Sequence, residues 1–220
     1  PYIPHLKSGK IVAVADPDSA RASKLADQFG AASYTDLADL LAHPQLDAVM
    51  VMTPTGTHAN VVTAAAAAGK HVYCEKPMAP TIEEADMMIE ACKTAGVFLM
   101  VAFMKRHNKS FQRAKEVIES GDLGAVFELR CIWDNGRAAA NTGDYRHRAE
   151  SGGGFLQEDG SHPLDVCRWW LGEVEEVTAN ALLVASDRLE NEDVAGVMLR
   201  HRSGALSSLH ITMLSHRRGL

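Results

Sequence analysis

The segment of the sequence best suited to catalysis is a glycine-rich run followed by acidic and histidine side chains. Glycines at 152–154 precede Glu158, His162 and Asp165, which share one face at positions i, i+4 and i+7 if the segment is helical. A carboxylate can fix the tautomer of an imidazole that exchanges a proton near neutral pH, so the spacing predicts an acid–base pair. Pro163 predicts that the helix bends or restarts at that point. A lone histidine is usually structural, but the glycines indicate a backbone that leaves room for a ligand.

A lysine closes one of the predicted strands. Glu75 and Lys76, followed by Pro77, end a strand predicted at residues 71–75. A lysine at such an edge is costly unless it has a carboxylate nearby or a task, and its ammonium could bind and polarise a substrate oxygen. The alternative is a solvated lysine, with the proline ending the strand.

A second run of candidates follows the strand predicted at residues 48–52. It contains Thr53, Pro54, Thr55 and His58. Ligands bind at the carboxyl edge of open parallel sheets, and small hydroxyl side chains with free N–H groups suit a ribose or a nicotinamide. A turn followed by a helix cap would use the same residue types, so both interpretations stay open.

Asp16 follows the strand predicted at residues 11–15. Its carboxylate could accept hydrogen bonds from both ribose hydroxyls of a dinucleotide and would repel a 2′-phosphate, which favours NAD over NADP. The alternative is that Asp16 is the N-cap of the next helix, with Pro17 as its first residue.

Two arginines stand near the same predicted edge. Arg106 belongs to a basic cluster at 105–107 just after the strand predicted at 97–103, and Arg146 precedes the glycines. Either could contact cofactor or substrate, although charged clusters are more often solvated.

The elements that must position these residues change in kind near residue 103. Before it, short β-branched runs alternate with helix-length apolar patterns, as in parallel βαβ units; after it, apolar and polar residues alternate in long strands. We predict an α/β fold with a Rossmann-type parallel sheet over residues 1–103 and an α/β domain with an open antiparallel sheet over 104–220. The elements expected besides those already given are helices at 17–30, 36–42, 57–69, 81–96, 110–120 and 155–171, strands at 32–34, 125–133, 174–185, 193–202 and 205–214, and a two-residue hairpin turn at Ser203 and Gly204.

Composition excludes several classes of protein. The 220 residues are 46% hydrophobic, so a core can form, and the net charge of −6 disfavours nucleic acid as a partner. No apolar stretch approaches the length of a membrane span, and no signal peptide opens the chain, so we expect a cytoplasmic protein. The four cysteines show no CxxC spacing, which predicts reduced thiols and no metal site.

One expected motif does not occur in the sequence. A dinucleotide-binding sheet carries a GxGxxG turn after its first strand, about 20 positions before the ribose-binding acid. Asp16 stands too near residue 1 for that turn to precede it. We therefore expect the central first strand to lie upstream, between the strands ending at Asp16 and Met52; an α/β fold that begins at 11–15 is the alternative. Because that gap leaves backbone groups unpaired, we expect the 220 residues alone to aggregate or to stay partly molten, and to bind NAD negligibly.

Taken together, Asp16, the run at 53–58, the Glu75-Lys76-Pro77 triplet and the glycine-to-Asp165 run resemble the glucose-fructose oxidoreductase / inositol dehydrogenase family (Gfo/Idh/MocA). The resemblance covers essentially the whole chain. It implies NAD(P)-dependent hydride transfer at a secondary alcohol or carbonyl of a sugar or cyclitol, and an oligomer formed through the open sheet. By the same resemblance Lys76 binds substrate and His162 accepts the proton, while Glu158 stands where inositol dehydrogenases most often have Asp.

Two other functions are compatible with these residues. The same family contains NAD-dependent glycosidases, and some relatives are non-catalytic sugar or dinucleotide sensors; the joint presence of Lys76 and His162 weighs against a sensor. We expect no nucleic-acid or membrane partner. The predicted catalytic residues are Lys76, Glu158 and His162; the predicted substrate contacts are these with Arg146 and Asp165; and the predicted cofactor contacts are Asp16, Thr53, Pro54, Thr55, His58, Glu75, Lys76 and Arg106.

Overall fold

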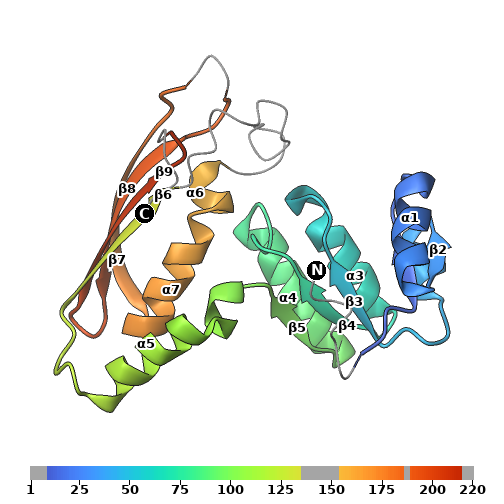
Figure 1. Ribbon diagram of the computed structural model, residues 1–220, viewed down its shortest axis with the longest axis horizontal. Coiled ribbons are helices and arrows are strands. Elements are labelled where there is room, and N and C mark those ends of the chain that lie inside the picture. The colour runs from blue at the N-terminus through green and yellow to red at the C-terminus, as the bar shows by residue number, and fades with distance from the viewer. Residues whose placement is uncertain (1–8, 135–153, 186–188, 215–220) are drawn as a thin grey trace. The chain divides into compact units, whose positions relative to one another are not determined.

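The computed structural model describes residues 9–134, 154–185 and 189–214 (Figure 1). The chain divides into two compact units. The N-terminal unit comprises residues 1–53, 57–74 and 83–100, and the C-terminal unit comprises residues 54–56, 75–82 and 101–220. Two short loops that follow strands of the N-terminal unit therefore belong to the C-terminal unit.

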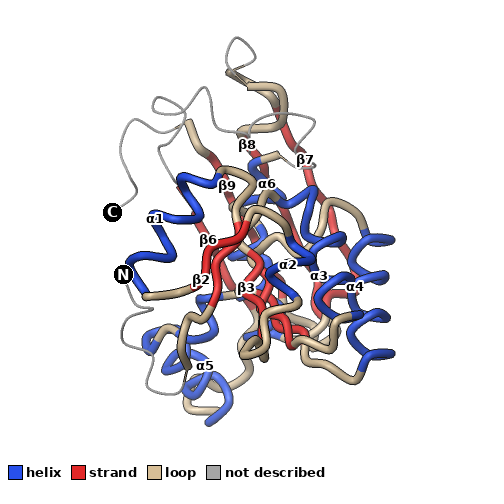
Figure 2. The backbone as a smooth tube through the Cα atoms, turned by 90° about the vertical axis from the view of Figure 1, so that its right-hand side faces the viewer, coloured by secondary structure: helices blue, strands red, loops and turns tan. Residues whose placement is uncertain are grey.

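The N-terminal unit consists of short strands alternating with helices, as the apolar pattern predicts. β1 pairs in parallel with β2, and β3 pairs in parallel with β4, which lies between β3 and β5. Figure 2 shows strands β2 and β3 of this unit in red and its helices α1 to α4 in blue. The elements are β1 (Ala13–Ala15), α1 (Ser19–Phe29), β2 (Ala32–Tyr34), α2 (Leu37–Leu41), β3 (Ala48–Val51), the 3-10 turn η2 (Thr55–Thr57), α3 (His58–Ala67), β4 (His71–Cys74), α4 (Ile82–Ala95) and β5 (Leu99–Val101).

The strands of this unit form two sheets. The first has the order β1-β2 and the second the order β3-β4-β5; within the described residues no ladder joins β1 to β3. In the predicted strand order an additional strand stands between these two.

The first helix begins two residues later than one interpretation of the sequence required. Its N-cap is Asp18, whose carboxylate accepts hydrogen bonds from the N–H groups of Ala20 (2.9 Å) and Arg21 (3.2 Å). The alternative in which Asp16 caps the helix is therefore wrong. The helix ends as predicted at Gly30, which adopts a left-handed conformation with φ of 61°.

The C-terminal unit is built on a four-stranded sheet with the order β6-β9-β8-β7. β7, β8 and β9 are antiparallel as predicted, but β6 pairs in parallel with β9, so the sheet is mixed and the prediction of a wholly antiparallel sheet is wrong. The elements are η3 (Met104–His107), α5 (Lys109–Ser120), β6 (Glu128–Asp134), α6 (Phe155–Glu158), α7 (Ser161–Leu171), β7 (Val174–Leu182), β8 (Val194–His201) and β9 (Leu206–Thr212).

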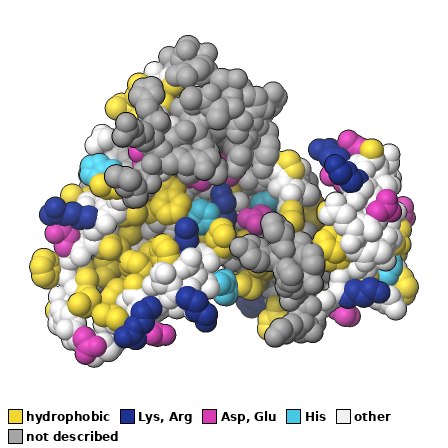
Figure 3. Space-filling model, in the orientation of Figure 1, with side chains coloured by type: hydrophobic (Ala, Val, Ile, Leu, Met, Phe, Trp, Pro, Cys, Tyr) yellow, Lys and Arg dark blue, Asp and Glu magenta, His cyan; other side chains and the backbone are white. Residues whose placement is uncertain are grey.

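Only one face of this sheet carries the hydrophobic core. Alternate residues of β8 and β9 pack with Phe155 of α6 and Cys167 of α7, and Figure 3 shows hydrophobic side chains gathered on this unit, at the left of the view. The register places alternate side chains on the opposite face, and several apolar ones there are exposed. They are Ile132, Leu182, Met198 and Leu206.

The turn between β8 and β9 is longer than predicted. Four residues, 202–205, connect the strands, so the prediction of a two-residue turn is wrong. Gly204 has φ of 88°, a conformation that favours glycine, and its N–H donates to the carbonyl oxygen of His201 (2.9 Å).

Candidate active site

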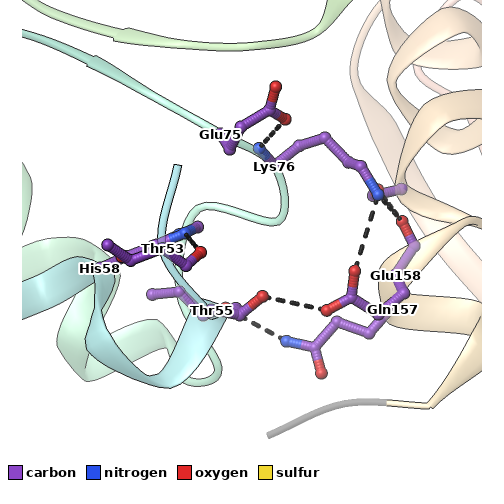
Figure 4. Close-up of polar contacts among 9 residues, drawn as sticks. Thr53, Thr55, His58, Glu75, Lys76, Gln157 and Glu158 are labelled. Carbon is purple, nitrogen blue, oxygen red and sulfur yellow. Dashed lines mark hydrogen bonds and ion pairs between the residues drawn. The ribbon is translucent and has the colours of Figure 1, made fainter. Parts of the chain in front are cut away.

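The buried carboxylate of Glu158 lies between a hydroxyl and an ammonium group of the C-terminal unit. Thr55 Oγ1 donates a hydrogen bond to Glu158 Oε1 (3.0 Å), and Lys76 Nζ lies 3.6 Å from Glu158 Oε2. Lys76 Nζ also donates to the backbone carbonyl oxygen of Glu158 (2.6 Å). Figure 4 shows the side chain of Lys76 extended toward Glu158, and the hydroxyl of Thr55 bonded to the carboxylate of Glu158. The structure thus brings together three of the predicted site residues.

Each of these side chains stands at the end of an element. Thr55 opens the turn after β3, Lys76 follows β4, and Glu158 is the last residue of the short helix α6. The side-chain amide of Gln157 donates to the carbonyl oxygens of Ala79 and Pro80, both at 3.1 Å. Gln157 therefore fixes the loop that carries Lys76 to the helix that carries Glu158.

The helix expected over this segment is interrupted. α6 ends at Glu158 and α7 begins at Ser161, so the helix restarts as predicted but earlier in the chain than the predicted position, Pro163. A Cβ on Gly160 would lie 2.3 Å from the carbonyl oxygen of Leu156, a distance that no side chain tolerates. Glycine is needed there because the backbone folds closely onto α6 between the two helices.

His162 is 8% exposed and lies in the first turn of α7. Its ring packs on that of Trp133, with 6.0 Å between the centroids, and its Nδ1 is buried without a hydrogen-bond partner in the described part of the chain. Burial lowers the pKa of His162 to about 4. The ammonium groups of Lys76 and Lys105 also lower this pKa, whereas the carboxylates of Asp159 and Asp165 raise it. The imidazole is therefore neutral at pH 7 and able to accept a proton.

The carboxylate of Asp165 is paired with the guanidinium group of Arg106. Arg106 donates to Asp165 through Nε (2.9 Å to Oδ2) and Nη2 (2.7 Å to Oδ1). Trp169 lies under the guanidinium, 5.8 Å from its carbon to the ring centroid. The hydrogen bond to Asp165 raises the pKa of Arg106. Arg106 thus neutralises a buried carboxylate one helical turn from His162.

Several predicted cofactor contacts belong to the N-terminal unit. Asp16 Oδ1 accepts from the N–H of Asp18 (2.8 Å) and lies 3.2 Å from Nη2 of Arg21. Thr53 Oγ1 accepts from the hydroxyl of Thr57 (2.7 Å), and the buried ring of His58 bonds the Thr53 carbonyl oxygen through Nε2 (2.9 Å). His58 therefore holds the turn after β3, and contact of these residues with a cofactor stays a prediction.

The other predicted contacts are distributed differently. Pro54 and Glu75 belong to the C-terminal unit, and Glu75 Oε2 accepts a hydrogen bond from the N–H of Lys76 (3.1 Å). Arg146 lies outside the described residues.

Three residues near this site have no signal of their own in the sequence. They are Trp133, Gln157 and Glu192, whose Oε1 accepts from the N–H of Leu156 (3.0 Å) at the start of α6. Trp133 and Glu192 belong to strands or turns far from the glycine-rich run, so only the folded chain brings them to it. Gln157 stands beside Glu158 in the sequence, but it donates to backbone carbonyl oxygens. Such partners cannot be predicted from residue types, because every residue has a backbone carbonyl.

The described residues contain neither a metal-binding cluster nor a membrane-spanning helix. In residues 9–134, 154–185 and 189–214, no group of three or more His, Cys, Asp or Glu side chains is placed to hold a metal ion. None of the helices in that part of the chain has the length and apolar character needed to cross a membrane.

Family models match both parts of the chain. Residues 1–103 match the model of the oxidoreductase family with an NAD-binding Rossmann fold, named GFO_IDH_MocA, and residues 111–219 match the GFO/IDH/MocA C-terminal domain.

Individual relatives agree with these matches. Myo-inositol 2-dehydrogenase of Thermotoga maritima is 35% identical over 201 residues, which cover 89% of this chain and 59% of that protein. An oxidoreductase from Agrobacterium radiobacter, solved with NAD+, L-tartaric acid and magnesium, superposes with a TM-score of 0.90 at 31% identity over 97% of this chain and 62% of its own. The WlbA dehydrogenase from Bordetella pertussis was solved with NADH and UDP-GlcNAcA. It superposes with a TM-score of 0.86 at 33% identity, and the match covers 96% of this chain and 61% of the WlbA chain. The chain thus spans about three fifths of the length of these proteins.

Proposed function

The chain belongs to the GFO/IDH/MocA family of oxidoreductases, and from this premise we propose that the protein transfers a hydride between NAD and a secondary alcohol or carbonyl of a sugar or cyclitol. The observation that carries the proposal is the arrangement of Lys76, Glu158 and His162 in one unit, with a neutral imidazole beside an ammonium group. Curated relatives named as inositol and apiose dehydrogenases support this substrate class.

The residues present fit part of a nicotinamide dinucleotide. The carboxylate of Asp16 and the hydroxyl of Thr53 are partly or fully exposed at the ends of β1 and β3, and both groups can hydrogen-bond ribose hydroxyls. We propose that they hold NAD; Asp16 disfavours the 2′-phosphate of NADP, although Arg21 lies beside it. The bound cofactor would supply or accept the hydride.

Lys76 would bind the oxygen atom of the reacting carbon. An ammonium group has three N–H donors. One donates to the carbonyl oxygen of Glu158 and a second faces its carboxylate, which leaves the third for a substrate oxygen. The positive charge stabilises the alkoxide that develops as the hydroxyl proton leaves.

His162 would accept that proton. The low pKa of about 4 keeps its ring unprotonated at neutral pH, as a general base requires. In the reverse direction the protonated ring returns the proton to the alkoxide. The backbone carbonyl oxygen of Glu158 positions Lys76, and Thr55 holds the carboxylate of Glu158. Asp165 with Arg106 supports the helix on which His162 stands.

The open face of the β6-β9-β8-β7 sheet fits a second copy of the chain. Ile132, Met198 and Leu206 are exposed on it although each is apolar. We propose that a homo-oligomer buries this face. Sedimentation of the wild type and of Ile132→Lys tests the proposal: the variant should shift toward monomer, and a wild-type monomer would contradict it.

A substrate panel tests the proposed activity. The full-length protein is mixed with NAD and with single cyclitols, aldoses and glycosides, and the formation of reduced nicotinamide is followed by absorbance. We expect NADH to accumulate with at least one of them. Release of sugar from a glycoside without net NADH would identify a glycosidase instead, and binding without turnover would identify a sensor.

A further inference from the structure

Within the described residues, Lys105 is a partly buried cation with no carboxylate partner. It lies in η3, directly before Arg106, whose guanidinium binds Asp165. In the part of the chain that the structure describes, Lys105 forms no ion pair. A partly buried ammonium without an anion is costly, because it has lost some of its water without gaining a counter-charge.

Aromatic rings hold this ammonium next to the candidate active site. Lys105 Nζ lies 5.1 Å from the ring centroid of Trp133 and 5.3 Å from that of Phe111, distances at which a cation is attracted to a ring face. The other neighbour of Trp133 is His162, at 6.0 Å between centroids. Lys105 and the proposed proton acceptor therefore contact the same indole.

The charges around His162 leave one cation unmatched. Lys76 lies against the carboxylate of Glu158, and Asp165 is bound by Arg106. Asp159 and Lys105 complete the set of charged groups that face the imidazole. Lys105 alone among the cations of this described set lacks a carboxylate within ion-pair distance.

A second group in the same place also lacks a partner. Trp133 Nε1 is buried and has no hydrogen-bond acceptor in the described residues, and His162 Nδ1 is in the same state. An indole N–H only donates, so its partner must be an acceptor atom. A buried donor beside an unmatched cation is the environment that an anionic oxygen satisfies, because it accepts from both.

We propose that Lys105 and Trp133 form a subsite for a carboxylate of the substrate. The substrate class is then a sugar acid rather than a neutral cyclitol. The inference rests on the proposed function, whose substrate it narrows. A carboxylate has two oxygens and can accept from the ammonium and from the indole N–H together. The reacting carbon would stand between this subsite and Lys76, with His162 adjacent to both.

An anionic oxygen could also come from a cofactor phosphate, so the experiment separates the two sources. The wild type, Lys105→Met and Lys105→Arg are assayed in the full-length protein with matched pairs that differ in one carboxylate: D-glucuronate with D-glucose, and D-galacturonate with D-galactose. Each pair is assayed with NAD and with NADP. Lys109→Met is the control, because Lys109 is an exposed lysine at the start of the next helix.

We expect the wild type to prefer the acid of at least one pair, and Lys105→Met to raise KM for that acid about 10–100-fold with a smaller change in kcat, as removal of a charged binding partner does. Lys105→Arg should restore most of the preference, and Lys109→Met should leave it unchanged. A wild type that prefers the neutral partners, or a Lys105→Met variant that weakens acid and neutral partners alike, would overturn the subsite. A rise confined to the KM of NAD or NADP would assign Lys105 to a phosphate and would also overturn it.

A binding measurement keeps this inference separable from the proposed activity. Calorimetric titration of D-glucuronate and D-galacturonate into the wild type and Lys105→Met measures the subsite without turnover. Binding of an acid that is lost in Lys105→Met supports the subsite even if no substrate reduces NAD, an outcome that would reject the proposed activity alone. Equal binding of the acids by both proteins rejects the subsite. Melting temperatures of all variants show that each is folded.

Discussion

The ammonium group of Lys76 lies 2.6 Å from the backbone carbonyl oxygen of Glu158, a residue 82 positions later in the chain. The contact fixes the lysine by a main-chain atom, which no substitution at position 158 removes. The carboxylate of Glu158, 3.6 Å from the same nitrogen, then adjusts charge rather than position. Loss of Lys76 should therefore be far more severe for activity than loss of the carboxylate.

Lys76→Ala and His162→Ala should each lower kcat/KM by about 10²–10⁴ while the protein stays folded, the range for losing an oxyanion partner or a positioned base. Steady-state kinetics of the full-length variants measure this. Lys70→Ala is the matched control, because Lys70 Nζ also donates to a backbone carbonyl, that of Leu46 (2.8 Å), in the N-terminal unit. Near wild-type turnover of Lys76→Ala would refute the assignment.

The pKa of His162 makes stability depend on pH. Its pKa is about 4 in the folded chain against an ordinary 6.5, so below pH 6.5 the unfolded chain takes up a proton that the folded chain does not. The free energy of unfolding should fall as the pH drops from about 6.5 to about 4, by up to about 3 kcal/mol from this residue. Urea denaturation of wild type and His162→Gln at a series of pH values tests this. Identical pH slopes for the two proteins would show that the imidazole is not buried in its neutral form.

Arg106→Met should destabilise the C-terminal unit, because it leaves the buried carboxylate of Asp165 without its bidentate partner. We expect a loss of about 1–3 kcal/mol, below the value for a fully buried pair because Arg106 is partly exposed. Thermal unfolding measures it. The double variant Arg106→Met with Asp165→Asn should recover part of the loss, whereas additive losses would mean that the two side chains act independently.

Gly160→Ala should disturb the break between α6 and α7, since its Cβ would meet the Leu156 carbonyl oxygen at 2.3 Å. We expect a loss of at least about 1–3 kcal/mol together with a loss of activity, because Glu158 and His162 flank the break. Gly196→Ala is the control, because a Cβ there meets no atom within 4 Å. Equal stability of the two variants in urea would show that the backbone approach is not tight.

Asp16→Ser should narrow the preference for NAD over NADP, because it removes the carboxylate that repels a 2′-phosphate while Arg21, 3.2 Å from Asp16, remains. The ratio of kcat/KM for the two cofactors measures the effect. Arg21→Ser should instead increase the preference for NAD over NADP. A ratio that neither substitution alters would confine Asp16 to its hydrogen bond with the N–H of Asp18.

The sequence carries enough information for the candidate site because its residues stand at ends of elements with strong local signals. Lys76 follows a short strand that a proline ends, and Glu158 and His162 follow glycines, so their types and spacing could be interpreted without a structure. The exact place of the helix break could not, because it depends on the close approach of Gly160 to the carbonyl oxygen of Leu156, a local backbone geometry that the residue types do not specify.

The sequence patterns could not predict which strands pair with each other in the sheet. Nothing local to β6 marks that it pairs in parallel with β9, about 80 residues later in the chain, since strand order depends on non-local contacts. Trp133 was missed for a related reason: its importance comes from Lys105 and His162 meeting its ring, not from a motif around it. The cap of α1 was ambiguous because Asp16 and Asp18 are both good N-cap residues, and only the helix start distinguishes them.

The division of the chain into units has a consequence for recombination between relatives. Thr55 and Lys76 are encoded among the first 103 residues but belong to the C-terminal unit, where their partner Glu158 lies. A chimaera joined near residue 103 would exchange the nucleotide-binding fold and, with it, two side chains of the other unit's site. Such a chimaera keeps the contacts of Thr55 and Lys76 with Glu158 only if the donor supplies a matching threonine and lysine, so the two halves cannot be exchanged independently at that junction.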